Sequence, residues 1–188
     1  MHIQYTPVEP EPILLSNSPY LHVGIGGTCI SLLGSGMHFI YKWSDCSALA
    51  AVFCAVNESV YEHIKIMLFP MLLWWIGVAI LTSRRSDALN AATGAMYLGT
   101  CILLVFNAAS QALEFESLAF DISLFVVCIY AGQAMGAAIM LRRWSFYYQI
   151  FLLALVVVLF TCTFAPPQWP YLFEDHRNRT FGRPSGCI

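Results

Sequence analysis

The chain has 188 residues, of which 59% are hydrophobic and 11% are charged. Because soluble domains carry about a quarter charged residues, this composition excludes an ordinary soluble domain and indicates an integral membrane protein. The formal net charge is −2, so the chain lacks the basic surface that nucleic acid requires, and we expect no nucleic-acid partner.

Three parts of the chain differ in composition. Residues 1–19 contain four prolines, and since proline lacks the amide hydrogen that a helix needs, they predict an extended tail. Residues 20–165 hold the long apolar stretches and predict a transmembrane bundle. Residues 166–188 are proline-rich and polar again, and they predict a C-terminal tail that folds over the bundle.

Five apolar stretches are each long enough to cross about 30 Å of hydrocarbon, which takes ~20 helical residues. They cover approximately residues 20–41, 60–82, 88–110, 118–141 and 145–165. Residues 44–56 are also apolar but too short to span, which predicts a re-entrant or interfacial half-helix. We therefore predict an all-α, polytopic membrane protein with about five transmembrane helices and one half-helix.

Small residues mark two of these spans as packing surfaces. The first span is rich in glycine, and the fourth contains a small-xxx-small pattern. Helices in lipid approach one another closely through such surfaces, so both spans are expected to lie inside the bundle or to contact a partner. The glycines assigned to helix packing are Gly24, Gly27, Gly34, Gly132 and Gly136.

The second span begins with the charged motif N-E-S-V-Y-E-H-I-K at residues 57–65. We expect Asn57 to cap the helix and Glu58 to lie in its first turn, where the helix dipole favours an anion. Glu58 and Glu62 would then share one helix face. Glu62, His63 and Lys65 lie deeper, where charged side chains usually pair with one another.

Two arginine pairs predict the orientation. Arg84 and Arg85 follow the second span, and Arg142 and Arg143 follow the fourth, so both pairs are expected on one side of the membrane. The positive-inside rule makes that side the cytoplasm or the mitochondrial matrix. The N-terminus is then inside and the C-terminus outside, in the inner mitochondrial membrane or a bacterial cytoplasmic membrane.

This topology gathers the remaining polar side chains into one cluster at the outer face. The cluster combines the end of the first span, the start of the second and the C-terminal tail. Its members are His38, Lys42, Glu58, Glu62, His63, Lys65, Asp175 and His176. We interpret it as a salt-bridge network that locks these segments together, because intramembrane charges usually pair.

A metal site is the alternative interpretation of this cluster. His38, Glu58, Glu62 and His63, with Asp175 as a further ligand, offer the imidazole and carboxylate groups that bind divalent ions. Their spacing differs from the H-E-x-x-H of zinc proteases. A haem between two of these histidines is less favoured, since surface histidines are more often structural. We expect no cofactor.

The seven cysteines contain no C-x-x-C pair, which argues against a zinc knuckle and a thioredoxin-like motif. Cys46, Cys54 and Cys187 are expected to share the outer aqueous side, where a disulfide can form. Their spacing does not decide whether any two of them pair.

Three blocks cover both ends of the chain: "MHFIYKWS", "FCAVNESVYEHIKIMLFPMLLWW" and "FTCTFAPPQWPYLFEDHRNRTFG". Together they resemble an uncharacterised family of small polytopic membrane proteins, mostly bacterial. The shared features are a histidine ending the first span, the N-E-S-x-x-E-H-x-K motif, and a proline-rich tail with an aspartate. His176 departs from the family, which tends to have proline there. The resemblance implies a common fold and outer-face site but no assigned activity.

For the function, we expect an accessory or structural subunit of a larger membrane complex, such as a respiratory or other energy-transducing assembly. The glycine surfaces offer more close-packing area than five helices need, so the expected partners are other membrane-protein subunits and bound lipids. The alternative is an enzyme, a metal-dependent membrane hydrolase acting at the outer leaflet. No nucleophile constellation supports it, and Ser59 is expected to be a helix residue.

Overall fold

The computed structural model of the chain describes residues 18–115, 117–142, 149–175 and 178–182. Most of these residues are in helices, and the described part contains no strand, so the all-α prediction is confirmed. In chain order the helices are η1 (Leu21–Gly26, a π-helical segment), α2 (Gly27–Trp43), α3 (Ala48–Phe53), α4 (Val60–Leu81), α5 (Arg85–Ala112), α6 (Leu118–Arg142), α7 (Gln149–Phe164) and α8 (Pro170–Phe173).

Four helical stretches are long and apolar enough to cross a membrane, which confirms a polytopic membrane protein. They are Leu21–Trp43, Val60–Leu81, Arg85–Ala112 and Leu118–Arg142. The fifth predicted span corresponds to α7, which is apolar but has 16 described residues, fewer than the ~20 that a full crossing takes. Residues 143–148, where that span was predicted to begin, lie outside the described part of the chain.

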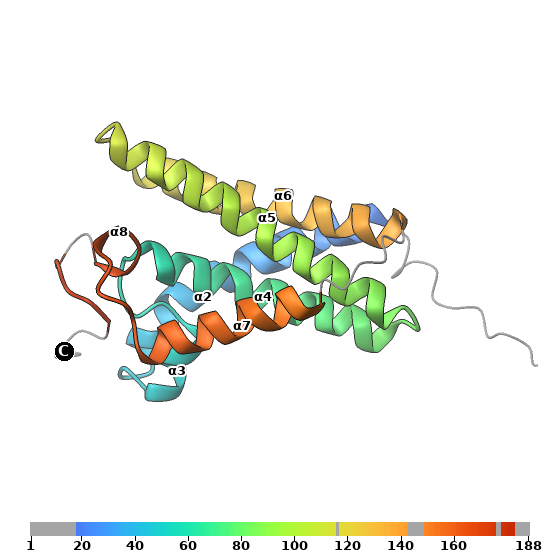
Figure 1. Ribbon diagram of the computed structural model, residues 1–188, viewed down its shortest axis with the longest axis horizontal. Coiled ribbons are helices and arrows are strands. Elements are labelled where there is room, and N and C mark those ends of the chain that lie inside the picture. The colour runs from blue at the N-terminus through green and yellow to red at the C-terminus, as the bar shows by residue number, and fades with distance from the viewer. Residues whose placement is uncertain (1–17, 116, 143–148, 176–177, 183–188) are drawn as a thin grey trace, which may run out of the picture.

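The bundle is built around α4, which packs against α2 on one side and α5 on the other. α5 and α6 form a long antiparallel hairpin along one edge of the molecule, and α7 runs along the opposite edge (Figure 1). Along the chain, the short helix α3 comes between α2 and α4, as predicted for the half-helix. Because α4 is enclosed by these neighbours, 61% of its apolar 18-residue stretch is buried.

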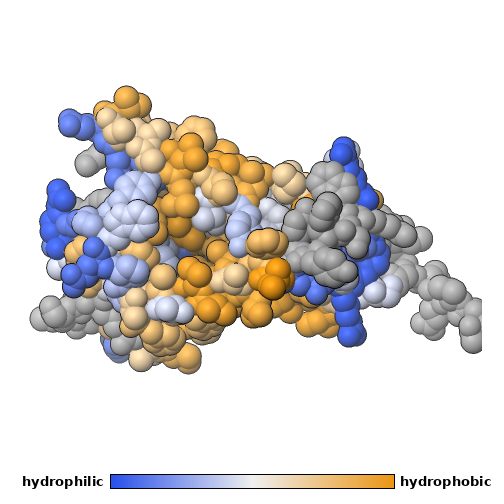
Figure 2. Space-filling view, viewed as in Figure 1, coloured by the Kyte–Doolittle hydropathy of each residue, from blue (hydrophilic) through white to orange (hydrophobic). Residues whose placement is uncertain are grey.

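The molecule has two distinct ends (Figure 1). We call the end with the α4–α5 connection and the C-terminus of α6 (residues 82–85 and 142) the arginine end. The opposite end, with α3, the start of α4 and α8 (residues 44–60, 165–175 and 178–182), is the tail end. Hydrophilic residues lie at both ends, and hydrophobic residues dominate the surface between them (Figure 2). This distribution is what a bundle surrounded by lipid at its middle requires.

Close packing joins α6 to its neighbours through two of the predicted glycines. A Cβ atom on Gly132 would lie 2.6 Å from the carbonyl oxygen of Ala95 on α5. A Cβ atom on Gly136 would collide with the indole ring of Trp75 on α4, a side chain that is fully buried. Glycine at these two positions therefore sets how closely α6 can approach α5 and α4.

The predicted packing glycines of η1 and α2 differ in how closely other helices approach them. A Cβ atom on Gly34 would lie 2.8 Å from the carbonyl oxygen of Ile66, and one on Gly27 would lie 3.0 Å from the ring of Tyr130. Gly24 is exposed, and a Cβ atom there would meet nothing within 4 Å. Within the described residues, Gly24 therefore does not pack against this chain's own helices, unlike the other four.

Candidate functional site

The start of α4 differs from the predicted one. Ser59 is the N-cap, and its hydroxyl oxygen accepts a hydrogen bond from the Glu62 amide at 3.4 Å. The side-chain oxygen of Asn57 accepts from the Ser59 amide at 2.9 Å, which forms an Asx turn. The predictions that Asn57 caps the helix and that Glu58 lies in its first turn are wrong. The Asx turn holds both residues outside the helix, so the helix starts two residues later.

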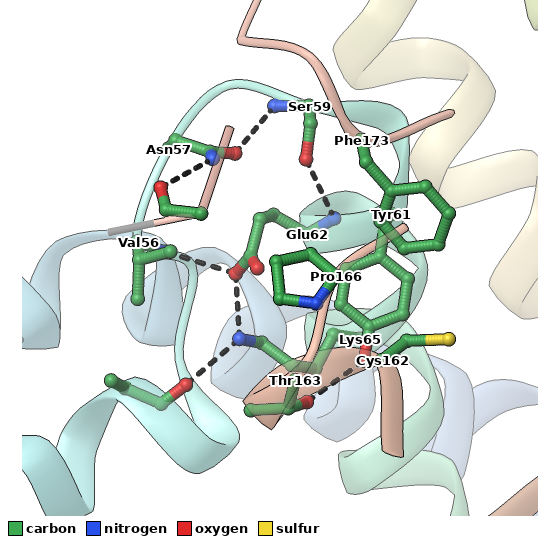
Figure 3. A pocket seen from close by; sticks show the side chains of 12 residues that line it. Val56, Asn57, Ser59, Tyr61, Glu62, Lys65, Cys162, Thr163, Pro166 and Phe173 are labelled. Carbon is green, nitrogen blue, oxygen red and sulfur yellow. Dashed lines mark hydrogen bonds and ion pairs between the residues drawn. The ribbon is translucent and has the colours of Figure 1, made fainter. Parts of the chain in front are cut away.

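This turn also separates the two carboxylates, which were expected to share a helix face. Glu62 lies in the first turn of α4 and points inward, where its carboxylate is 2.6 Å from the ammonium of Lys65. The Lys65 ammonium also donates to the carbonyl oxygen of Ala51 on α3 at 2.9 Å. The Val56 amide donates to the Glu62 carboxylate at 3.0 Å. Figure 3 shows this arrangement, which we call the Glu62–Lys65 lock.

The lock joins α4 to α3 and to the connection between them. Both side chains are buried, and Lys65 is fully enclosed. Buried ions are stable only when their hydrogen-bonding groups are satisfied, and here backbone groups of Ala51 and Val56 complete the pair. The lock is therefore a structural element that ties two charged side chains of α4 to the backbone of Ala51 and Val56.

The C-terminal tail covers the lock. The side-chain amide of Asn57 donates to the carbonyl oxygen of Gly182 at 3.0 Å, which connects the motif to the tail. Tyr61 packs its ring against Phe173 of α8, with ring centroids 4.9 Å apart. The Tyr61 hydroxyl lies 2.8 Å from the hydroxyl of Thr163 on α7. Three separate segments therefore meet over the first turn of α4 (Figure 3).

A small cavity lies beside the lock. Its volume is about 30 Å³, and the residues that line it include Tyr61, Glu62, Lys65, Thr163 and Phe173. A cavity of this size has room for one or two water molecules, since each needs roughly 10–15 Å³ by this measure. It is too small for an organic substrate.

Asp175 organises the tail itself. Its side chain is buried and accepts hydrogen bonds from the amide and the side chain of Asn178, at 3.3 and 3.0 Å. Its own amide donates to the carbonyl oxygen of Thr180 at 2.8 Å. These contacts close a turn within the tail. His176 lies outside the described residues, and Lys42 is exposed on the last turn of α2.

A second group lies at the tail end, apart from the lock. The Nε2 atom of His38 is 3.4 Å from a carboxylate oxygen of Glu58, and the Nε2 atom of His63 is 4.0 Å from the same oxygen. The two imidazole rings are 5.4 Å apart between centroids. All three side chains are partly exposed, at 24–34%. The single cluster expected from the sequence is thus divided into a buried ion pair and a surface group of two histidines and one carboxylate.

His22 is a buried polar residue that had no counterpart in the sequence predictions. His22 of η1 stacks on Trp75 with ring centroids 4.8 Å apart, and the Trp74 indole donates to its Nδ1 atom at 3.4 Å. A single histidine in an apolar stretch carries no spacing signal, so the pattern of the sequence does not reveal it. In the sequence, only the adjacent tryptophans at positions 74 and 75 indicate that aromatic side chains gather in this part of the bundle.

The cysteines of the tail end also differ from one another. Cys46 is disulfide-bonded, and Cys54 is free and buried. Burial raises the pKa of the Cys54 thiol above its usual range, which makes it an unreactive packing residue. Cys187 lies outside the described residues.

Among the comparisons with known proteins, only the comparison with protein families gave a match. No match was found among curated proteins or among solved structures. The model of a family of unknown function matches residues 14–183, which includes every helix and the described tail. This agrees with the expected membership of an uncharacterised family. The chain belongs to the family of unknown function DUF6512.

Proposed function

We propose that this protein is an accessory subunit of a larger membrane complex. The observation that carries the proposal is the incomplete covering of the first span. In residues 21–43, only 28% of the apolar 18-residue stretch is buried. The buried share of the corresponding stretch is 61% in α4, 44% in α5 and 56% in α6. A helix that the described part of the chain covers so little leaves a long face for another subunit.

The uncovered face of the first span contains a shallow groove of about 410 Å³. Gly24 and Thr28, four residues apart, form its small-residue face, and the Thr28 hydroxyl lies 2.9 Å from the hydroxyl of Tyr130 on α6. Ile25 and Cys29 are also part of its lining. Small residues at this spacing allow the backbone of a second helix to come close, so the proposed occupant is a transmembrane helix of another subunit.

The proposed setting is the inner mitochondrial membrane or a bacterial cytoplasmic membrane, in a respiratory or other energy-transducing complex, with bound lipids around the bundle. The arginine end faces the cytoplasm or matrix, and the tail end faces outward. Two observations support this orientation. Arg84 and Arg85 lie at the arginine end, as the positive-inside rule requires. The disulfide at Cys46 lies at the tail end, and disulfides persist in oxidising compartments.

Native purification in mild detergent, followed by mass spectrometry, tests the proposal. Wild-type protein should purify with at least one other membrane subunit. Gly24→Leu should release it by filling the groove, because a Cβ atom at Gly24 has no neighbour within 4 Å among the described residues and the leucine can be accommodated by this chain's own fold. Gly77→Leu is the matched control, since a Cβ atom at Gly77 also has no neighbour within 4 Å. A wild-type protein that purifies alone as a stable monomer would contradict the proposal.

A metal-dependent hydrolase at the outer leaflet is the second candidate function. The group formed by His38, Glu58 and His63 favours it, because two imidazoles and one carboxylate are also the protein ligands of some catalytic zinc sites. Hydrolysis of a lipid or small ester by the purified protein, abolished by a chelator and restored by zinc, would select this candidate over the first.

A further inference from the structure

We propose that His38, Glu58 and His63 bind a divalent transition-metal ion such as Zn²⁺, independently of the subunit function. The ligand atoms of the three side chains all lie within 4.8 Å of one another. They come from three different elements: the last turns of α2, the turn before α4, and the first turn of α4. A bound ion would therefore join α2 to the start of α4.

The distances suit such an ion. Bonds of about 2.0–2.2 Å to a tetrahedral zinc place neighbouring ligand atoms about 3.3–3.5 Å apart. The Nε2 atom of His38 is already 3.4 Å from the Glu58 oxygen. The Nε2 atom of His63 is 4.0 Å from the same oxygen, and all three ligand atoms lie within 4.8 Å of one another, so modest shifts of the partly exposed side chains bring them to metal distances.

The tautomer of His63 is set for metal binding. Its Nδ1 atom is 2.9 Å from the carbonyl oxygen of Ser59, which can only accept a hydrogen bond. Nδ1 must therefore carry the proton, and in the neutral ring Nε2 presents its lone pair toward Glu58. A backbone carbonyl that holds the far nitrogen is the usual outer partner of a metal-binding histidine. A lone pair and a carboxylate oxygen that face each other offer two ligand atoms to a cation between them.

The surrounding charge also favours a cation. Glu58 supplies one negative charge, and Asp121, near the start of α6, acts electrostatically on His63 from the side of the α5–α6 hairpin. Glu62, which the sequence had suggested as a ligand, is held by Lys65 at 2.6 Å and is not part of the group. The partial exposure of the three ligands leaves positions on the ion open to water, as in zinc sites that keep a free coordination position.

The donor set suits a divalent ion better than a haem. A haem with two histidine ligands needs the two Nε2 atoms on opposite faces of a porphyrin. Here the Glu58 carboxylate approaches both Nε2 atoms, at 3.4 and 4.0 Å. Imidazole and carboxylate ligands together are typical of zinc and of ferrous iron, and we use Zn²⁺ as the probe.

The test measures metal content in full-length protein purified in detergent without a polyhistidine tag. Wild-type protein, incubated with Zn²⁺ and then dialysed, should retain about one ion per chain and should melt at a higher temperature than chelator-treated protein. Glu58→Gln and His63→Ala should each lower the Zn²⁺ affinity by about tenfold or more. Asp45→Asn is the matched control, because Asp45 is an exposed carboxylate at the same end and its left-handed backbone, with φ of 49°, suits asparagine.

Two outcomes of the metal-content measurement would overturn the proposal. One is wild-type protein that retains almost no metal after incubation with Zn²⁺, and the other is equal metal content in wild type and Glu58→Gln. If the variants do not fold, X-ray absorption at the zinc edge of the wild-type protein still decides. The expected spectrum shows two imidazole ligands and oxygen neighbours, and a spectrum with oxygen neighbours alone would also overturn the proposal.

Discussion

The Lys65 ammonium lies 2.6 Å from the Glu62 carboxylate inside the bundle, and Lys65 is fully buried. A lysine in this position is stable only while its partner remains charged and its other donors are satisfied. The carbonyl oxygen of Ala51 accepts a hydrogen bond from the Lys65 ammonium, and the amide of Val56 donates one to the Glu62 carboxylate. The pair therefore connects the first turn of α4 to the backbone of α3 and of the α3–α4 connection, and it makes the fold of the tail end depend on two side chains.

Removal of one member of this pair should destabilise the protein strongly. Glu62→Gln keeps the shape of the side chain but leaves the Lys65 charge without its partner, so we expect a loss of about 3–5 kcal/mol. Thermal unfolding in detergent measures it. Lys42→Met, at an exposed lysine of α2, is the control and should change stability little. The double variant Glu62→Leu/Lys65→Met should recover most of the loss, and an additive effect would contradict the ion pair.

The glycines of α6 give a second prediction. Gly132→Ala places a methyl group 2.6 Å from the carbonyl oxygen of Ala95, so α6 must move away from α5. We expect a loss of about 1–3 kcal/mol, the usual cost of overpacking. Gly77→Ala, where a Cβ atom has no neighbour within 4 Å, should be neutral or slightly stabilising because alanine favours the helix. Equal melting temperatures for the two variants would show that α6 does not pack this closely.

The cysteines of the tail end should differ in their chemistry. Alkylation of denatured, unreduced protein should modify Cys54 and leave Cys46 unmodified until a reductant is added. In the folded protein Cys54 should also react slowly, because burial raises its pKa and reduces the thiolate fraction at neutral pH. Peptide mass spectrometry measures both. Modification of Cys46 before reduction would show that this end does not face an oxidising compartment.

The proposed orientation predicts opposite accessibility for the two ends. In a background without the free cysteines, Ser86→Cys at the start of α5 should be labelled only after the membrane is made permeable. Phe115→Cys, in the turn between α5 and α6, should be labelled in intact cells or in mitochondria with a ruptured outer membrane. Both positions are exposed, so access to the reagent depends on the side of the membrane alone. Labelling of both from the same side would contradict the topology.

The apolar residues of the chain determined most of the fold without reference to tertiary contacts. A backbone in lipid must satisfy its hydrogen bonds within a helix, so long apolar runs predict helices and their number predicts the topology. This reasoning identified the four long helices, the shorter α7 and the half-helix α3. It also identified Gly132 and Gly136 as packing residues, because a small-xxx-small pattern on a helix has a local signature.

The tertiary structure decided how the charged motif is divided. Glu58 and Glu62 are four residues apart, and their spacing alone predicts a shared helix face. The Asx turn at Asn57 prevents the two side chains from sharing a helix face, because it keeps Glu58 outside the helix while Glu62 lies in the first turn. Their partners also include groups that the motif does not contain, such as His38 for Glu58 and the Val56 amide for Glu62.

The same contrast holds for the glycines and the tail. The sequence predicts Gly24 and Gly27 alike as packing residues. In the structure a Cβ atom on Gly27 would contact the ring of Tyr130 on α6, and one on Gly24 would have no neighbour within 4 Å. Asp175 also closes a turn within the tail through Asn178, a contact that its place in the sequence did not predict. Composition and periodicity determine which segments are helices in lipid, because the hydrocarbon acts on each segment separately. The neighbours of each side chain depend on how the helices meet, and only the folded chain decides that.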